Sequence, residues 1–395
     1  MTDSTFLTRV KLKNYKSIAA CDVTLGPLTF LVGPNGSGKS NFLDALRFVT
    51  DGLRNSLDHA LRDRGGIQEV RRRSSGHPNH FGLRLEFRLS NGSTGSYAFE
   101  IAARPSGGYV VQKEQCVLNG GTAEFLVQEG RLYRSSATVP PPPSDDRLYL
   151  VNAAGLPEFR PIYEALSRMG FYNPNPDSVR DLQLPDSGEL LTRDGNNIAS
   201  VLGQLGKHSG AKERIEEYLS QVVPGIEGVE RQVLGPRETL LFRQKVVGAK
   251  HPWHFSAANM SDGTLRALAV LVALFQGSNG LAGRTPLVGI EEPETALHPA
   301  AAGVLRDSLR DASQFTQILV TSHSPELLDD AQLPVEAILA VVSDQGETRI
   351  GQCDEATREM LRKRLFTAGE LLRLNQLRPN PKLFEESSRQ TVLFS

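Results

Sequence analysis

The sequence predicts an α/β fold in which helices flank a mostly parallel sheet, with an antiparallel β subdomain and a helical insertion added to it. Apolar strands and helices alternate through the last third of the chain, which is typical of a parallel sheet covered on both faces. Strand-like segments between glycine-rich turns occupy residues 81–118 and favour antiparallel pairing. Residues 151–225 mix helical stretches with many prolines, asparagines and glycines. We therefore expect a first lobe at 1–150, a helical insertion at 151–225 and a second lobe at 226–395.

The bulk composition suits a packed globular protein. Of the 395 residues, 39% are apolar and 23% charged, and the formal net charge is −1. A charge this small supplies no global basic field for nucleic acid. The three cysteines lie far apart, which argues against a disulfide framework or zinc site and favours the cytoplasm. No apolar run reaches the ~20 residues that span a bilayer, so we expect no membrane contact.

The N-terminal region reads as strands followed by a helix. Strands are predicted at 6–15, 21–25 and 28–33, and a helix at 39–53 whose apolar residues recur at helical spacing. Further strands are predicted at 81–89, 97–103 and 109–118. The proline run at 139–146 cannot form a helix or central strand, and we interpret it as an exposed loop.

The second half alternates between element types. A helix is predicted at 211–222, and strands at 229–234 and 239–247. Helices at 263–275, 299–312 and 324–330 then alternate with strands at 286–290, 317–320 and 337–342. The pattern of the remaining C-terminal residues predicts a short helical cap. The sequence contains no sustained heptads, so we expect no coiled-coil arm.

A phosphate-binding loop is the strongest motif. Residues 33–40 read GPNGSGKS, between an apolar strand and an amphipathic helix. The glycines let backbone N–H groups face phosphate oxygens at a helix N-terminus, Lys39 can reach the β- and γ-phosphates, and Ser40 can ligate Mg²⁺. The residues expected to contact the nucleotide are Asn35, Gly36, Ser37, Gly38, Lys39, Ser40 and Asn41.

Acidic residues and a histidine follow two predicted strands. PLVGIEEPE ends a strand at Glu291 and Glu292, and TQILVTSHSP ends another just before His323. We assign Glu291 to magnesium and Glu292 to general base for the attacking water. A neutral imidazole at His323 could hydrogen-bond the γ-phosphate, because open α/β sheets bind ligands at the carboxyl ends of their strands.

A second helix start stands at MSDGTLR. Ser261 is a candidate N-cap, and Gly263 allows close backbone approach. This start can bind an anion, or it can be an ordinary capped core helix; the residues alone leave both interpretations open.

The four motifs, in this order, resemble the ABC-type ATPase superfamily. More closely they resemble its soluble RecF/SMC/OLD-like branch, a group of predicted AAA-family ATPases. VKLKNYKSI, LGPLTFLVGPNGSGKSN and EEPETALHP resemble that branch as well, so the resemblance covers most of residues 1–50 and 255–330. It implies a P-loop ABC-type ATPase head that uses ATP and Mg²⁺ and completes its sites when two copies form a homodimer.

The resemblance also implies residue roles. Lys39 and Ser40 would be the Walker A pair, Glu291 and Glu292 Walker B, and His323 the switch histidine. Ser261 and Gly263 would be signature residues that touch the γ-phosphate across the homodimer, while residues 294–298 would cross its axis. Asn14, Lys16 and Ser17 fall where the branch places residues near the nucleotide.

Some positions depart from the family pattern or stay ambiguous. Asp262 and Thr264 stand where transporters have Gly and Gln, and Glu291 stands where Asp is usual. Gln68 is our candidate for the glutamine that ligates magnesium; a solvated loop glutamine is the alternative interpretation.

Two functions fit these features. The first is an ATP-dependent dimerising ATPase that controls a separate partner protein, such as a nuclease or toxin in an anti-phage defence complex. The second is a RecF-like repair and maintenance ATPase in which ATP gates DNA binding. A basic run could hold DNA phosphates or be a solvated surface: Arg62, Arg64, Arg71, Arg72 and Arg73. A transporter ATPase is disfavoured by the long segment between GPNGSGKS and MSDGTLR, and we expect no nuclease active site within this sequence.

Overall fold

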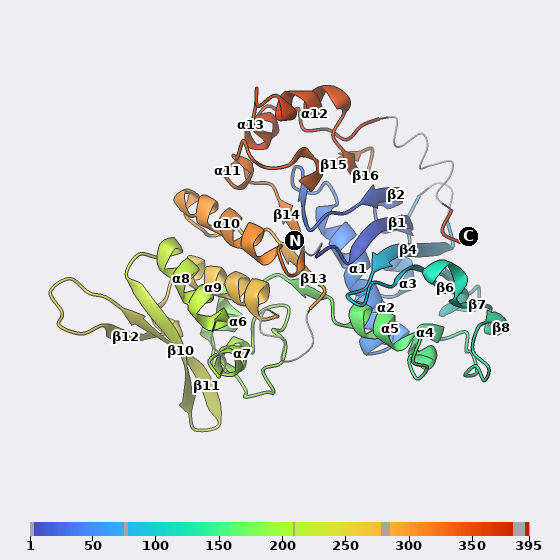
Figure 1. Ribbon diagram of the computed structural model, residues 1–395, viewed down its shortest axis with the longest axis horizontal. Helices are drawn as coiled ribbons and strands as arrows, with labels where there is room; N and C mark the ends of the chain where they lie inside the picture. The colour runs from blue at the N-terminus through green and yellow to red at the C-terminus, as the bar shows by residue number, and fades with distance from the viewer. Residues whose placement is uncertain (1–3, 75–77, 208–209, 278–284, 382–391, 395) are drawn as a thin grey trace. The chain divides into compact units, whose positions relative to one another are not determined.

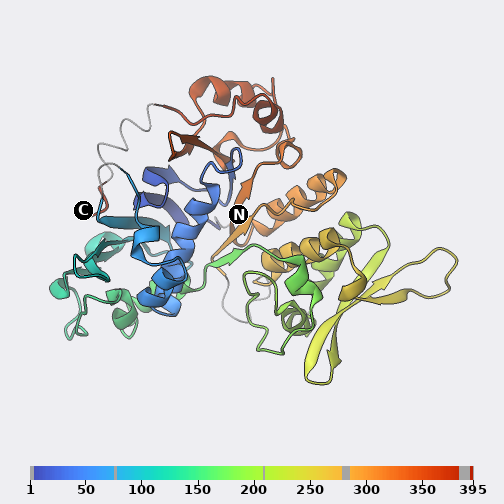
Figure 2. The same ribbon diagram turned by 180° about the vertical axis from the view of Figure 1, so that it is seen from behind.

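The computed structural model describes residues 4–74, 78–207, 210–277, 285–381 and 392–394. The chain forms two compact units. The N-terminal unit comprises Thr5–Met169, Ala331–Thr367 and Leu371–Ser395, and the central unit comprises Gly170–Asp330 with Met1–Ser4 and Ala368–Glu370. This division cuts across the three segments expected from the sequence, because the chain after residue 330 returns to the N-terminal unit (Figures 1 and 2).

A seven-stranded antiparallel sheet dominates the N-terminal unit, as the predicted antiparallel subdomain requires. Its strand order is β2-β1-β4-β5-β6-β7-β8. The predicted strands at 6–15 and 21–25 therefore belong to it, together with a hairpin over residues 123–135 that the sequence did not indicate, whereas the predicted strand at 28–33 does not. The strands are β1 (Leu7–Tyr15), β2 (Ile18–Thr24), β4 (His80–Arg88), β5 (Thr94–Ala103), β6 (Tyr109–Leu118), β7 (Ala123–Gln128) and β8 (Arg131–Ser135).

A second group of strands in this unit carries the glycine-rich loop. β3 (Leu28–Val32) pairs in parallel with β15 (Ile338–Asp344), which pairs antiparallel with β16 (Glu347–Gln352). The unit's helices are α1 (Lys39–Arg54), α2 (Leu57–Arg62), α3 (Ile67–Val70), α4 (Tyr149–Ala153), α5 (Arg160–Ser167) and α12 (Glu355–Arg362), and α13 (Ala368–Arg373) follows α12. Helix α1 buries the predicted apolar face, formed by Phe42, Leu43, Leu46 and Val49.

The central unit is built on three parallel strands. β13 (Leu287–Glu291) pairs with β14 (Gln317–Ser322) and with β9 (Gly170–Tyr172). In the register, Glu291 aligns with Thr321, and Ile290 with Tyr172. The carboxyl ends of these strands therefore meet at one edge, which is where α/β sheets bind ligands. The sequence had indicated helix around β9, because three residues are too few to show a strand pattern.

Helices and a small antiparallel sheet complete the central unit. The sheet contains β10 (Ile226–Leu234), β11 (Arg237–Gln244) and β12 (Trp253–Ser256). The helices are α6 (Pro176–Arg180), α7 (Ile198–Leu205), α8 (Ala211–Val222), α9 (Asp262–Phe275), α10 (Ala302–Ala312) and α11 (Pro325–Leu328). Helix α9 is buried from Thr264 to Phe275 and lies against α6, α7 and α8 (Figure 1), as expected of a helix that is apolar on all sides.

None of the helices in the described ranges is both long and apolar enough to cross a membrane.

Candidate functional site

The glycine-rich loop joins β3 to α1 in a conformation that only glycine adopts easily. Gly36 and Gly38 have φ angles of 73° and 100°. A Cβ atom on Gly38 would also clash with the side chain of Thr348 in β16. No side chain of the described residues caps the start of α1, where Gly38 is the N-cap. The start of this long helix therefore lacks a side-chain acceptor, and a helix start of this kind favours an anion.

The loop also holds a buried positive charge. Lys39 is 4% exposed, and its Nζ donates to the carbonyl oxygens of Gly33 and Pro34 at 2.8 and 3.0 Å. The hydroxyl of Ser37 is buried and has no hydrogen-bond partner within the described ranges. Asn35, Gly36 and Ser40 are exposed. An uncapped helix start, a lysine and an orphaned hydroxyl together fit the oxygens of a phosphate chain.

A chain of hydroxyl groups supports this loop. Asn41 Nδ2 donates to Ser17 Oγ at 2.6 Å, and Ser17 Oγ lies 2.7 Å from Thr348 Oγ1. The Thr348 hydroxyl donates to the Ser37 carbonyl at 2.9 Å, so the Ser17 hydroxyl must be the donor to Thr348. The structure thus brings Ser17 and Asn41 together beside the loop. Sequence reasoning missed Thr348, because no motif surrounds it.

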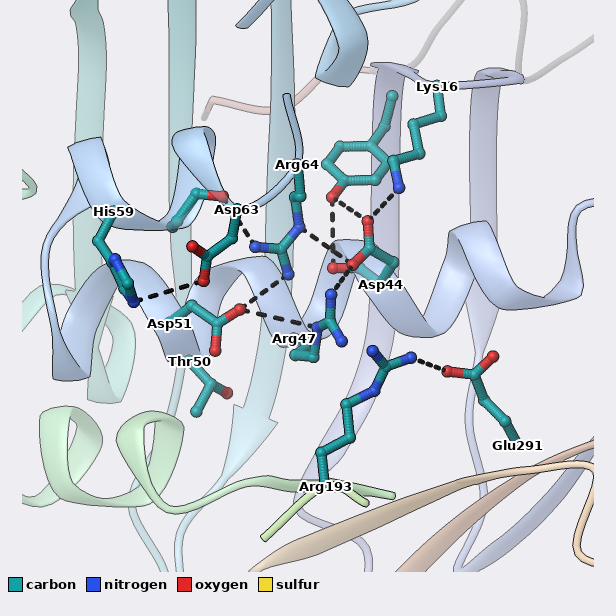
Figure 3. Close-up of polar contacts among 12 residues, drawn as sticks. Lys16, Asp44, Arg47, Thr50, Asp51, His59, Asp63, Arg64, Arg193 and Glu291 are labelled. Carbon is teal, nitrogen blue, oxygen red and sulfur yellow. Dashed lines mark hydrogen bonds and ion pairs between the residues drawn. The ribbon is translucent and has the colours of Figure 1, made fainter. Parts of the chain in front are cut away.

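Lys16 is anchored by an acidic centre on α1. Its Nζ lies 2.6 Å from Asp44 Oδ2, and Asp44 also binds Arg47 at 2.8 Å and Arg64 at 3.0 Å (Figure 3). Burial works to raise the pKa of Asp44, but the charges of Arg64, Lys16 and Arg47 outweigh it and lower that pKa. Asp44 is therefore ionised and holds Lys16 against the helix that carries the phosphate loop.

Arg64 corrects one expectation about the basic run. Its side chain is 2% exposed, and it binds Asp51 at 2.9 Å besides Asp44. This guanidinium is a buried structural group and is not available to DNA. The other arginines of the run also have local partners: Arg62 pairs with Asp58, Arg71 with Gln68, Arg72 with Glu347 and Arg73 with Glu69.

Gln68 lies on the exposed side of α3. Its Oε1 accepts a hydrogen bond from Arg71 Nε at 2.7 Å. The end of α3 is bonded to the turn that carries Lys16, since Lys16 N donates to Val70 O at 2.7 Å. The assignment of Gln68 to magnesium stays a prediction.

In the central unit, the register of β13 and β14 brings Glu292 and His323 together. His323 Nδ1 lies 3.2 Å from Glu292 Oε1. The amide of Glu292 donates to Thr321 O at 3.0 Å, so the turn after β13 is tied to the neighbouring strand. Glu292 has a φ of 44°, a left-handed conformation that costs a non-glycine residue about 1–3 kcal/mol and is typical of functional sites.

Arg266 of α9 holds this turn in place. It is 7% exposed and donates to the carbonyl oxygens of Glu291 at 3.1 Å, Glu292 at 3.0 Å and Pro174 at 2.6 Å. Burial lowers the pKa of Arg266, and the carboxylates of Glu294, Glu292 and Glu291 oppose that shift. Sequence reasoning missed this role, although Arg266 is the one charged residue between Leu265 and Phe275.

Glu294 links the same turn to the end of β14. Its Oε1 accepts from Ser322 Oγ at 2.6 Å and from the His323 amide at 3.4 Å. Its Oε2 is buried and lacks a partner in the described part of the chain. Burial raises the pKa of Glu294 above its ordinary value, against the opposing hydrogen bond from Ser322.

Glu291 already faces a cation. Its Oε1 lies 2.8 Å from Arg193 Nη2, and its side chain is 19% exposed (Figure 3). Glu291 thus offers a carboxylate oxygen at a strand end, which is the ligand type that Mg²⁺ takes. Its assignment to magnesium stays a prediction.

The predicted start of α9 is also found. Ser261 is exposed, and its Oγ accepts from Thr264 N at 3.2 Å as the N-cap. A Cβ atom on Gly263 would lie 2.5 Å from the carbonyl oxygen of Ala296. Gly263 is therefore needed for packing against the loop after β13, whatever else it contacts.

Comparison with known proteins matches most of the chain to one family. The family model described as "AAA domain, putative AbiEii toxin, Type IV TA system" matches residues 28–329. The chain is 43% identical to the DNA replication and repair protein RecF of Vibrio vulnificus (strain YJ016) over 47 residues, 12% of this chain and 13% of RecF. It is 46% identical to the OLD nuclease of Thermus scotoductus (strain ATCC 700910 / SA-01) over 43 residues, 11% of this chain and 8% of the nuclease.

A solved structure extends the similarity to the whole fold. The structure described as the SmcHead bound to the C-winged helix domain of ScpA has a TM-score of 0.57 and 15% identity, and the match covers 89% of this chain and 99% of that chain. At this identity the likeness establishes the fold alone. The chain matches only a small part of the curated relatives' length, 13% in RecF and 8% in the OLD nuclease.

Proposed function

The chain belongs to the AAA-domain family described above, an ATPase family of the RecF/SMC/OLD type, and from this premise we propose that it binds ATP with Mg²⁺ and hydrolyses it. The observation that carries the proposal is the 3.2 Å contact of His323 with Glu292 at the ends of paired parallel strands. This pair supplies a carboxylate and an imidazole at a ligand-binding edge, in a chain whose phosphate loop is also formed.

Each residue has a distinct part in the proposed reaction. Lys39 and the amides at the start of α1 bind the phosphate chain, and Ser40 and Glu291 would hold the metal. Bound Mg²⁺ neutralises charge on the phosphate oxygens. Glu292 accepts a proton from the attacking water, and His323 hydrogen-bonds the γ-phosphate. Arg266 and Glu294 position the turn that carries the base.

We further propose that the reaction needs a homodimer. Ser261 and Asp262 are exposed at the start of α9, where the helix dipole favours an anion. The Ser261–Gly263 start of a second copy would contact the γ-phosphate, so that ATP binding closes the dimer and hydrolysis opens it. A separate effector protein would respond to this cycle, as the described Smc head is bound to a domain of ScpA.

Glu292→Gln tests the proposal. Removing a general base lowers a rate by roughly 10²- to 10⁴-fold, so ATP turnover should fall by at least about 100-fold. ATP should still bind, and light scattering should detect a dimer that persists with ATP. Glu227→Gln, an exposed change on β10, is the control. Unchanged turnover in Glu292→Gln would refute the assignment of the base.

ATP-gated DNA binding is a second candidate, favoured by the similarity to RecF. The guanidinium groups of Arg62 and Arg73 are 77% and 68% exposed, and their partners Asp58 and Glu69 are exposed carboxylates. Exposed pairs of this kind are weak, so a DNA phosphate can replace the carboxylate.

A further inference from the structure

Arg193 places its guanidinium on the carboxylate that we assign to magnesium. Arg193 Nη2 lies 2.8 Å from Glu291 Oε1 (Figure 3). The side chain of Arg193 is 48% exposed and that of Glu291 is 19% exposed. Arg193 comes from the irregular segment between α6 and α7, to which neither the sequence motifs nor the proposed reaction assign a role.

The backbone of Arg193 is held in register with Glu291. The amide of Asn173 donates to Arg193 O at 2.9 Å, and the amide of Asn175 donates to Asp194 O at 2.9 Å. Asn173 directly follows β9, whose Tyr172 aligns with Ile290 of β13. Because Asn173 and Glu291 each lie one residue beyond the aligned pair Tyr172–Ile290, the strand register itself brings Arg193 to Glu291.

The side chain of a buried asparagine holds the backbone of the segment around Arg193. Asn197 is 4% exposed; its Oδ1 accepts from Thr192 N at 2.8 Å and its Nδ2 donates to Leu190 O at 2.9 Å. These bonds restrict the backbone on both sides of Arg193. Its half-exposed side chain remains able to swing into water at little desolvation cost.

A divalent cation and a guanidinium cannot both occupy this carboxylate without repulsion between them. We infer that Arg193 is the counter-ion of Glu291 when no metal is bound, and that Mg²⁺ must displace it. The segment between α6 and α7, which carries Arg193, thereby raises the Mg²⁺ concentration that is needed to fill the site. This inference rests on the proposed role of Glu291 as a metal ligand.

Arg193→Ala tests the inference in the full chain with Mn²⁺ as the probe. Binding is measured by electron paramagnetic resonance without nucleotide, and by calorimetry with preformed Mn²⁺–ATP. Removing the competing cation should tighten both by about two- to fivefold, the range that a half-exposed ion pair supports. Arg193→Lys retains the charge and should bind Mn²⁺ more weakly than Arg193→Ala.

The chain offers a closely matched control. Arg214 is 47% exposed and pairs with Asp311, 21% exposed, at 3.3 Å in the same unit. Arg214→Ala removes an equivalent ion pair away from the ends of the parallel strands, so it should leave Mn²⁺ binding unchanged. Urea unfolding of both alanine variants checks that each is folded.

Glu291→Gln separates failure of the inference from failure of the proposed function. If Glu291→Gln leaves Mn²⁺ binding unchanged, Glu291 is not a metal ligand, and both its proposed metal role and the counter-ion role of Arg193 fall. If Glu291→Gln weakens binding while Arg193→Ala leaves it unchanged, only the counter-ion role is overturned. Weaker Mn²⁺–ATP binding in Arg193→Ala would also overturn it, because the arginine would then assist the nucleotide.

Discussion

Replacing Arg266 with methionine should cost stability and turnover together. The change removes every donor from a buried side chain that serves the carbonyls of Glu291, Glu292 and Pro174. The Glu292 carbonyl keeps the Thr295 amide as a donor at 3.1 Å, whereas the carbonyls of Glu291 and Pro174 lose the Arg266 donor. An orphaned buried acceptor costs about 1–3 kcal/mol. We expect the central unit to lose about 3–5 kcal/mol of its free energy of unfolding.

The effect on turnover follows from the conformation of Glu292. Its left-handed backbone costs about 1–3 kcal/mol, which the surrounding bonds must offset. Without Arg266 the turn relaxes, and the productive orientation of the base becomes rarer by about 5- to 100-fold. The kcat should fall by that factor, while ATP affinity changes little because Lys39 and the phosphate loop are untouched.

Urea unfolding followed by circular dichroism and steady-state ATPase kinetics measure the two effects. Arg306→Met is the control, since Arg306 is 17% exposed and pairs with Asp330 at 3.2 Å away from the catalytic turn. The control should lose stability without losing kcat. The reasoning fails if Arg266→Met keeps the kcat of the wild type, because its role would then be structural only.

Two further predictions concern the N-terminal unit. Burial raises the pKa of Glu114 to about 7, above the unfolded value, so the stability that its protonated form contributes is lost as pH rises from about 4.5 to 7. Glu114→Gln should therefore flatten the pH dependence of the free energy of unfolding in urea. An unaltered slope would exclude Glu114 as the source of that dependence. The Arg62→Glu/Arg73→Glu double variant should lose ATP-dependent duplex binding and its salt dependence, and wild-type protein that binds no labelled duplex at low salt would remove the DNA candidate.

The local parts of the site were predictable from sequence. The phosphate loop is contiguous, and its glycines, lysine and flanking elements dictate backbone conformation and hydrogen bonds within a few residues. The N-cap at Ser261 is local in the same way. The strand ends at Glu291 and His323 were predictable because apolar runs stop there, and parallel strands align their ends.

Other features depend on contacts between distant segments. Arg64 belongs to a run that looks like a charged surface, yet Asp44 and Asp51 bury it against α1. Thr348 supports the phosphate loop from β16, far along the chain, and sequence spacing contains no trace of this contact.

The sequence by itself therefore determined the fold class, the phosphate loop and the strand ends that carry Glu292 and His323, because short-range geometry and hydrophobic periodicity encode them. Only the tertiary structure decided which arginines bind the end of β13 and the turn after it. Arg193 reaches Glu291 and Arg266 reaches the turn after β13 through strand register and helix packing. Both depend on pairings between residues distant in sequence, and those pairings have no local signature in the chain.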